Sequence, residues 1–420
     1  MTPVRRGIHP AWIAAIVAFL ALIGAAGFRA APSVLMLPLE AEFGWSRTEL
    51  SVAVTVNLLL YGLTAPFAAA LMARFGLRRV TAGALVLVSA GAALSVFATA
   101  PWMLVLTWGL MIGLGTGSMA LVFAATVADT WFVRRRGLVV GVLTAGGATG
   151  QLVFLPIIAV IVTDQGWRAA SLVVAAGALI VVPLVWIFLR DSPAELGTTP
   201  YGAAPEWAPV PRPRGNAVRM ALSTLGRAAR VRTFWALAAG FAICGATTNG
   251  LVGTHFIPSA HDHGMPETTA AGLLALVGLF DIAGTIVSGW LTDRVDPRIL
   301  LGIYYAGRGV GLAALPFLLG ATVQPPMIVF IVVYGLDWVA TVPPTVALCR
   351  ELFGADGPIV FGWVFASHQV GAAIAATLAG FVRDSTGNYT VAWFAAAGLC
   401  VVAAVVSLGI ARRPRAVVAA

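Results

Sequence analysis

Apolar stretches of membrane-crossing length follow one another along almost the whole chain. A helix needs about 20 residues to cross the hydrocarbon core of a bilayer, and a helix satisfies all of its own backbone polar groups there. We therefore predict an all-α integral membrane protein with twelve transmembrane helices. They are expected near residues 11–38, 51–72, 80–99, 102–126, 137–163, 168–189, 233–258, 268–291, 298–320, 326–349, 358–381 and 388–410.

The composition fits a membrane protein and argues against other classes. Hydrophobic residues make up 60% of the chain and charged residues only 10%, whereas soluble domains average about 25% charged residues. The net charge of +9 arises from arginines in short loops rather than from one basic patch, so we expect no nucleic-acid partner. Cys244, Cys349 and Cys400 lie in or beside apolar segments without a CxxC motif, which predicts core packing rather than a redox or metal role.

Residues 190–232 interrupt the apolar pattern and divide the chain. This segment is rich in proline, glycine and charge, which is typical of a linker, and we expect an amphipathic helix near residues 216–230. The predicted domains are an N-terminal six-helix bundle (1–189), a cytoplasmic linker (190–232), and a C-terminal six-helix bundle with a short cytoplasmic tail (233–420).

The distribution of arginine predicts the orientation of the chain. Arginines gather in both tails, in the linker and in the loops on one side of the predicted helices, whereas only Arg47, Arg168 and Arg383 lie in loops on the other side. By the positive-inside rule, both termini and the linker are cytoplasmic. The first apolar segment lacks a small-residue cleavage site, so we interpret it as the first helix of a multi-pass inner (plasma) membrane protein.

A similar loop follows the second predicted helix of each half. The first loop reads ALMARFGLRRV and the second GWLTDRVDPRIL, so we interpret the chain as two six-helix repeats, the plan of secondary transporters. The second loop resembles the G-x-L-x-D-R signature of the major facilitator superfamily, and this resemblance implies the fold of that superfamily. Ala73 stands where the first copy should carry Asp. The resemblance also implies a gating role for the loop residues Asp293, Arg294, Arg74 and Arg78.

Residues 131–150 hold an aromatic residue, three arginines and a G-x-x-x-A-G-x-x-x-G pattern, whose small residues also let two helices approach closely. This stretch is similar to one in the monocarboxylate transporter family, whose bacterial relatives include oxalate/formate exchangers. Asp281 matches the acid of that family's helix 8, but Thr285 stands where the family has an Arg one turn later. The family's helix 1 Lys is also absent, and Arg29 lies one turn before its place.

Two arginines lie inside predicted membrane spans, where a charge is costly unless it faces a cavity or a partner. Arg29 is in predicted helix 1, and we expect its guanidinium, a planar fork suited to carboxylates, to bind the substrate or to pair with a buried acid. Arg308 is in predicted helix 9. We consider three roles for Arg308: an ion pair with Asp281 or Asp337, snorkelling of the side chain toward the membrane surface, and a contact to the substrate.

Two acids share this depth and are the candidates for proton coupling. Asp281 could switch between a protonated and an ion-paired state as the cavity opens to either side, and a permanent pair with an arginine is the alternative. Asp337 is the second candidate, in predicted helix 10. Pro343 and Pro344 should break or kink that helix and free backbone carbonyls toward the cavity.

His368, in predicted helix 11, is a third titratable group at membrane depth. It is a candidate for a proton relay or an anion contact, or else for hydrogen-bonded packing, and oxalate exchangers of the resembled family carry a Lys on this helix. The polar residues Gln369, Gln151, Asn57 and Asn249 either line the cavity or bond neighbouring helices.

No cofactor and no metal are predicted. The sequence lacks a Walker-type GxxxxGK[ST] motif, so ATP does not drive the protein, and no Ser–His–Asp or H-E-x-x-H arrangement indicates an enzyme. The sequence HDH at 261–263 lies in a predicted loop and is geometrically poor as a metal cage. We predict a monomeric secondary transporter that moves a small organic anion, a monocarboxylate, together with a proton by alternating access.

Three other functions stay open at this point. They are a proton-coupled exporter of a metabolite or drug, an anion exchanger, and a transporter-like sensor that signals through residues 190–232. A cationic or neutral lipophilic substrate would favour the exporter, with Asp281 and Asp337 as its contacts. The sequence shows no sizeable soluble domain, which disfavours the sensor.

Overall fold

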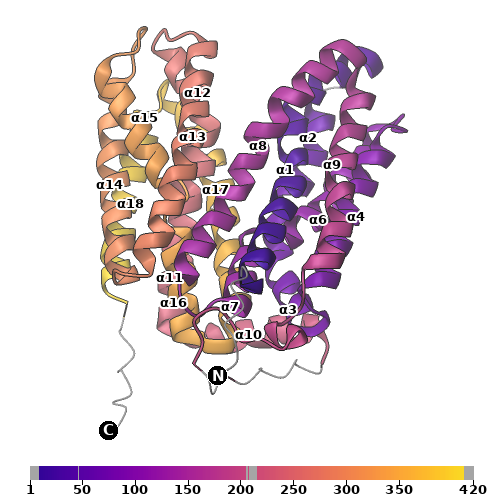
Figure 1. Ribbon diagram of the computed structural model, residues 1–420. Coiled ribbons are helices and arrows are strands. Elements are labelled where there is room, and N and C mark those ends of the chain that lie inside the picture. The colour runs from indigo at the N-terminus through magenta and orange to yellow at the C-terminus, as the bar shows by residue number, and fades with distance from the viewer. Residues whose placement is uncertain (1–8, 46, 205–206, 208–214, 411–420) are drawn as a thin grey trace. The chain divides into compact units, whose positions relative to one another are not determined.

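The computed structural model describes residues 9–45, 47–204, 207 and 215–410. Within these residues the chain is helical (Figure 1), with one isolated parallel bridge between Phe132 and Tyr201, and the predicted all-α class is confirmed. The chain divides into two compact units, Met1–Ala221 and Leu222–Ala420, and the boundary in the sequence falls inside the predicted linker. For some of the described residues the structure gives the backbone but not the side chain. They are residues 27–34, 36–37, 47–48, 51, 151–153, 155–156, 159, 267–268 and 384.

The first unit contains six helical segments in sequence. The first, third, fifth and sixth segments are single helices, whereas the second consists of two helices and the fourth of four consecutive pieces. The bounds are α1 (Pro10–Phe43), α2 (Arg47–Leu63) with α3 (Ala65–Phe75), α4 (Leu77–Ser95), α5 (Pro101–Leu104) with a π-helix (Val105–Ile112), α6 (Gly113–Ser118) and α7 (Leu121–Trp131), α8 (Arg136–Gln165) and α9 (Trp167–Phe188).

The second unit repeats this order of six segments. They are preceded by α10 (Ala217–Ala228), which lies where the sequence predicts an amphipathic linker helix. The bounds are α11 (Arg232–Gly245) with a π-helix (Ala246–Val252) and α12 (Gly253–Asp262), α13 (Glu267–Thr292), α14 (Pro297–Leu318), α15 (Pro325–Asp337) with α16 (Val342–Phe353), α17 (Gly357–Thr386) and α18 (Thr390–Leu408).

The same segments pack together in both units. The first segment packs on the fifth (α1 on α8, α11 on α17), and the third packs on the sixth (α4 on α9, α14 on α18). The second packs on the fourth, with α2 on the π-helix Val105–Ile112 and α13 on α15. This shared packing order within each unit is the structural counterpart of the repeat that the two similar loops indicate.

The described residues include fewer continuous membrane spans than the twelve predicted ones. Some spans are bent or run together, and α1 and α8 are described only in part. Eight stretches qualify by length and hydropathy, or nine when the pair Val52–Leu63 and Ala65–Phe75, bent by 52°, counts as one. One of them, Pro325–Arg383, has 59 residues. At about 1.5 Å per residue this run is far longer than one crossing of a core about 30 Å thick, and it contains α15, α16 and α17.

Two of the interruptions coincide with prolines. Pro66 lies in the first turn of α3, and Pro343 and Pro344 lie in the first turn of α16, where a missing backbone N–H costs no helical hydrogen bond. The break between α15 and α16, at residues 338–341, is the one that the sequence predicts. The bend before α3 and both π-helices were not expected, since a hydropathy pattern carries no signal for them.

Glycines let the paired helices touch through their backbones. A Cβ on Gly371 of α17 would overlap the Ala242 carbonyl of α11, and a Cβ on Gly284 of α13 would overlap the Leu336 carbonyl of α15. In the first unit, Gly150 of α8 leaves a Cβ only 2.9 Å from the Ile23 carbonyl oxygen. Small residues therefore set the spacing of these pairs, as the pattern in residues 131–150 predicts for α8.

This spacing can be tested with two alanine substitutions, one at a close helix contact and one at an open helix position. Gly371→Ala should lower the thermal unfolding temperature in detergent micelles, because overpacking costs about 1–3 kcal/mol. Gly398→Ala on α18, where a Cβ meets no atom within 4 Å, should leave that temperature unchanged or raise it, because alanine favours a helix over glycine by about 1 kcal/mol. Equal shifts in the two variants would contradict the close contact.

Candidate functional site

The break between α15 and α16 collects the charged groups of the second unit. Because residues 338–341 leave the α-helical pattern, carbonyl oxygens that a continuous helix would use remain free for side chains. Arg308 of α14 donates to the carbonyls of Asp337 and Trp338, at 2.7 and 3.3 Å from Nη2. Ser288 of α13 donates to the carbonyl of Ala340. The break at residues 338–341 thus provides acceptors for side chains of α13 and α14.

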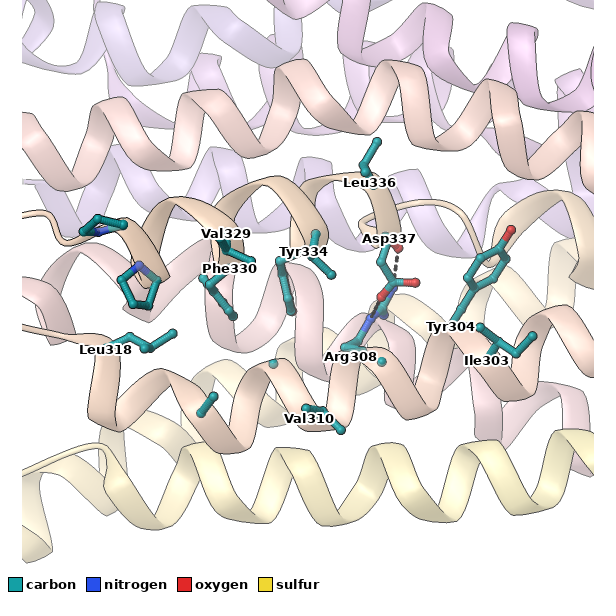
Figure 2. A pocket seen from close by; sticks show the side chains of 16 residues that line it. Ile303, Tyr304, Arg308, Val310, Leu318, Val329, Phe330, Tyr334, Leu336 and Asp337 are labelled. Atoms are coloured by element: carbon teal, nitrogen blue, oxygen red, sulfur yellow. Dashed lines mark hydrogen bonds and ion pairs between the residues drawn. The ribbon is translucent and has the colours of Figure 1, made fainter.

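Arg308 is fully buried, and every N–H of its guanidinium has an acceptor. Its Nε lies 2.6 Å from Asp337 Oδ2, which makes a charge-assisted hydrogen bond within the ion pair (Figure 2). Its Nη1 donates to Cys244 Sγ at 3.1 Å and to Thr247 Oγ1 at 3.4 Å. With the two carbonyl bonds from Nη2, the five donors of the side chain are all in use.

Asp281 is the second acid at the same break. It is 4% exposed, and its Oδ1 accepts from the Thr285 hydroxyl at 2.8 Å and from the Val339 backbone N–H at 3.1 Å. The charges of Arg308 and Asp337 both act on it electrostatically. Thr285 occupies the position where the resembled family has an arginine, so the positive charge of this region comes from α14 instead.

Asp281, Asp337 and Arg308 together form what we name the charge cluster. Two carboxylates and one guanidinium carry one excess negative charge when all are ionised. An uncompensated charge away from water is costly, so the cluster can lower its energy by taking up one positive charge. A proton or a bound cation can supply it.

His368 lies on α17 beside the cluster and is connected to it through Cys244. It is 8% exposed, its Nδ1 is buried without a hydrogen-bond partner, and its ring stands 5.0 Å from that of Phe241 and 5.9 Å from that of Phe365. It interacts with the Cys244 thiol, which also accepts from Arg308. Cys244 is buried as predicted, but it belongs to a polar network rather than to plain core packing.

Threonine and tyrosine residues complete the network, and no sequence motif marks the threonines. Thr341 Oγ1 lies 3.2 Å from Cys244 Sγ. The Tyr334 hydroxyl donates to the Thr247 carbonyl at 2.8 Å, and the Tyr305 hydroxyl donates to the Gly240 carbonyl at 2.7 Å. A threonine in an apolar span is too common to mark a site without knowledge of its neighbours.

The remaining predicted binding residues are dispersed. Asn57 donates from Nδ2 to the Trp108 carbonyl at 2.7 Å, so it joins two helical segments of the first unit. Asn249 is exposed in the second π-helix, and Gln369 is half-buried on α17. The side chains of Arg29 and Gln151 lie outside the described residues, although their backbones belong to α1 and α8.

The four predicted gating residues lie at helix ends in their respective units. Arg294 Nη1 donates to the Trp290 carbonyl, and its guanidinium lies 4.0 Å from the centre of the Trp290 ring. Asp293 caps the C-terminus of α13. Arg74 lies over the Phe75 ring and Arg78 over the Trp186 ring.

An acid from another segment reaches the first of the two similar loops, where Ala73 replaces the expected Asp. The Asp191 carboxylate, just after α9, accepts from the Arg78 backbone N–H at 2.7 Å and fills the space that a side chain on Gly76 would need. Gly76 has a φ of +93°, which favours glycine. Sequence spacing alone could not reveal this contact, because the two residues are far apart in the chain.

Comparisons with known proteins agree on one family. The profile described as Major Facilitator Superfamily matches residues 14–357 and 256–419. Human monocarboxylate transporter 11 is 28% identical over 416 residues, which cover 96% of this chain and 83% of that protein. The uncharacterized MFS-type transporter YcxA of Bacillus subtilis is 25% identical over 387 residues, or 90% of each chain.

Solved structures show the same fold. The Escherichia coli fucose:proton symporter FucP superposes with a TM-score of 0.66 at 17% sequence identity, over 95% of this chain and 100% of that one. At this identity the likeness concerns the fold alone.

The coupling between Arg308 and Asp337 can be measured with a double-mutant cycle. Arg308→Leu leaves a buried carboxylate without its counter-ion, which costs about 3–5 kcal/mol, so thermal unfolding in detergent micelles should shift strongly downward. The double variant Arg308→Leu/Asp337→Asn should regain most of that loss.

A matched control is Arg383→Leu. Arg383 pairs with Asp262 at 3.1 Å, but both side chains are substantially exposed, and such surface pairs contribute about 0–1 kcal/mol. Strictly additive effects of the Arg308 and Asp337 substitutions would show that the two residues are not coupled.

Proposed function

The chain belongs to the Major Facilitator Superfamily, a superfamily of membrane transporters rather than enzymes, and from this premise we propose that it is a proton-coupled symporter of a small organic anion. The proposed substrate class is a monocarboxylate, and the proposed mechanism is alternating access between two six-helix halves. Likeness to monocarboxylate transporters 11 and 13 supports this class. The observation that carries the coupling is the charge cluster, with its two acids for one guanidinium.

We assign the coupling proton to Asp281. Protonation of Asp337 would weaken a buried ion pair whose atoms are 2.6 Å apart, and such pairs are costly to break. Asp281 accepts one bond from a neutral hydroxyl and one from a backbone N–H, so a proton there displaces no bonded counter-ion. Asp337 is the second acid of the proposal, because its charge helps to set the cost of ionising Asp281.

The substrate carboxylate needs a cation with free donors. Arg308 has none to spare, so we assign it the role of counter-ion to the two acids. In the second unit, His368 keeps an unpartnered ring nitrogen and is the proposed contact, with Gln369 and Asn249 as weaker candidates. In the first unit, Arg29 stays the proposed cation, with Asn57 and Gln151 as polar candidates.

Orientation and gating are part of the same proposal. The bias of arginines toward the tails, the linker and one set of loops supports cytoplasmic termini in the inner (plasma) membrane. Asp293, Arg294, Arg74 and Arg78 lie at helix ends where charge contacts can change as a transporter changes its conformation. A single chain with both halves supports a monomer as the working unit.

The excess negative charge of the cluster also favours one other function, the export of a cationic or neutral lipophilic compound in exchange for protons. In that case Asp281 and Asp337 would contact the substrate and not only the proton. A transport panel with both anions and cations separates the two proposals. An anion exchanger would move labelled anion against unlabelled anion without a proton gradient.

We expect Asp281→Asn to abolish proton-driven accumulation of the anion and to leave anion exchange measurable, because an amide can donate and accept hydrogen bonds but cannot take up the coupling proton. The measurement uses proteoliposomes under an inward proton gradient, with lumenal pH followed as lactate, pyruvate, acetate, oxalate and larger acids are added. Asp164→Asn, an exposed acid at the end of α8, is the matched control and should behave as wild type.

Empty liposomes correct for protonated weak acids that cross the lipid unaided. Proton-driven uptake by Asp281→Asn at the wild-type level would overturn the coupling assignment. If the wild-type protein transports none of the anions but does transport a lipophilic cation, the symport proposal is wrong and the exporter proposal takes its place.

A further inference from the structure

A groove with a volume of about 780 Å³ runs between α14 and α15 of the second unit. Most of its lining is apolar, and its walls are open to the outside: Val310 is 72% exposed and Val329 is 62% exposed. Figure 2 shows the groove extending from Leu318 toward Tyr304, with the Arg308–Asp337 ion pair nearer the Tyr304 end. Small-molecule pockets have volumes of about 300–1,000 Å³, so this groove is large enough to hold a ligand.

Among the polar groups of Arg308, Tyr334 and Asp337 that line the groove, one acceptor has no hydrogen-bond donor. All N–H groups of Arg308 have acceptors, and the Tyr334 hydroxyl donates to the Thr247 carbonyl. Asp337 Oδ1 is buried and has no hydrogen-bond partner, although the side chain keeps 12% of its surface exposed. Figure 2 shows one carboxylate oxygen against Arg308 and the other turned toward Tyr304. A buried acceptor without a donor is rare and costly.

Charge narrows the chemistry of the ligand further. Arg308 has no donor left for an anion, and the charge cluster carries one excess negative charge when both acids are ionised. A ligand that fits must therefore bring a hydrogen-bond donor, and a positive charge improves the match. Its remaining part must be apolar, because valine, leucine, isoleucine, proline and phenylalanine side chains form most of the walls on either side.

We propose that this groove is a binding site for a medium-chain aliphatic amine that enters from the surrounding bilayer. The alkyl chain lies along the walls of α14 and α15, and the amine or ammonium N–H donates to Asp337 Oδ1. Neither of the proposed substrate contacts, His368 and Arg29, is among the residues that line the groove. Occupation of the groove is therefore tested by a binding measurement and not by transport.

Thermal unfolding of the purified protein in detergent micelles tests the chemistry of the head group. Octylamine should raise the unfolding temperature in a saturable manner, because a ligand that binds only the folded state stabilises it. Octyltrimethylammonium has the same tail and charge but no N–H, and octanoate has the opposite charge, so neither should produce the shift. No shift with octylamine, or an equal shift with octyltrimethylammonium, would overturn the proposal.

Two groove variants and one control locate the site. Gly307 lines the groove, and a Cβ there meets no atom within 4 Å, so Gly307→Leu should fill the groove and weaken the apparent affinity for octylamine at least tenfold. Val333→Phe narrows it from α15 and should act in the same direction if Gly307→Leu folds poorly. Gly398→Leu on α18 is equally open but lies outside the groove, and it should bind as wild type.

These variants leave the charge cluster intact, so the result is independent of the symport proposal. Wild-type affinity for octylamine in both groove variants would place the amine elsewhere and overturn the inference.

Discussion

The buried ion pair of Arg308 and Asp337 is the interaction on which the second unit's polar interior depends. Removing a guanidinium from water costs several kcal/mol unless its donors are satisfied, and apolar helices offer few acceptors because their carbonyls are used internally. The break at residues 338–341 supplies two carbonyls, and α11 and the following π-helix supply a thiol and a hydroxyl. The broken helix and the buried arginine therefore require each other.

One guanidinium for two acids gives this region its chemical character. Asp337 has the direct ion pair, and Asp281 is left with a hydroxyl and a backbone N–H. The two acids consequently differ although both are buried within the same unit. The resembled family has an arginine one turn after its helix 8 acid, and here Thr285 holds that position. Here Arg308 of helix α14 supplies the positive charge near Asp281 instead. An arginine is therefore still present near the acid, but it belongs to a different helix.

Much of this architecture could be predicted from the sequence, because it depends on local chemistry. Apolar stretches indicate membrane helices, Pro343 and Pro344 indicate a break, and charges inside apolar stretches indicate buried pairing. What could not be predicted depends on rotation and depth. Each residue turns a helix by about 100°, so a small error in depth decides whether Arg308 meets Asp281, Asp337 or neither.

Other features leave no local trace at all. The contact of Asp191 with the loop at Gly76 joins distant segments, and the π-helices have the same hydropathy as their surroundings. Cys244 carries no motif and gains its role only from the helices that pack around it. For Arg29 and Gln151 the sequence stays the only guide to the side chain.

The hydrogen bond from the Val339 amide to Asp281 turns a single charge into a mechanical property. An ionised carboxylate accepts a hydrogen bond more strongly than a neutral acid does. The charge of Asp281 on α13 therefore determines how strongly the backbone between α15 and α16 is held at Val339. Those few residues form turns rather than a continuous helix, and breaks of this kind are where long helices bend. Protonation of Asp281 thus loosens this turn, and the flexibility of the turn reports whether Asp281 holds a proton.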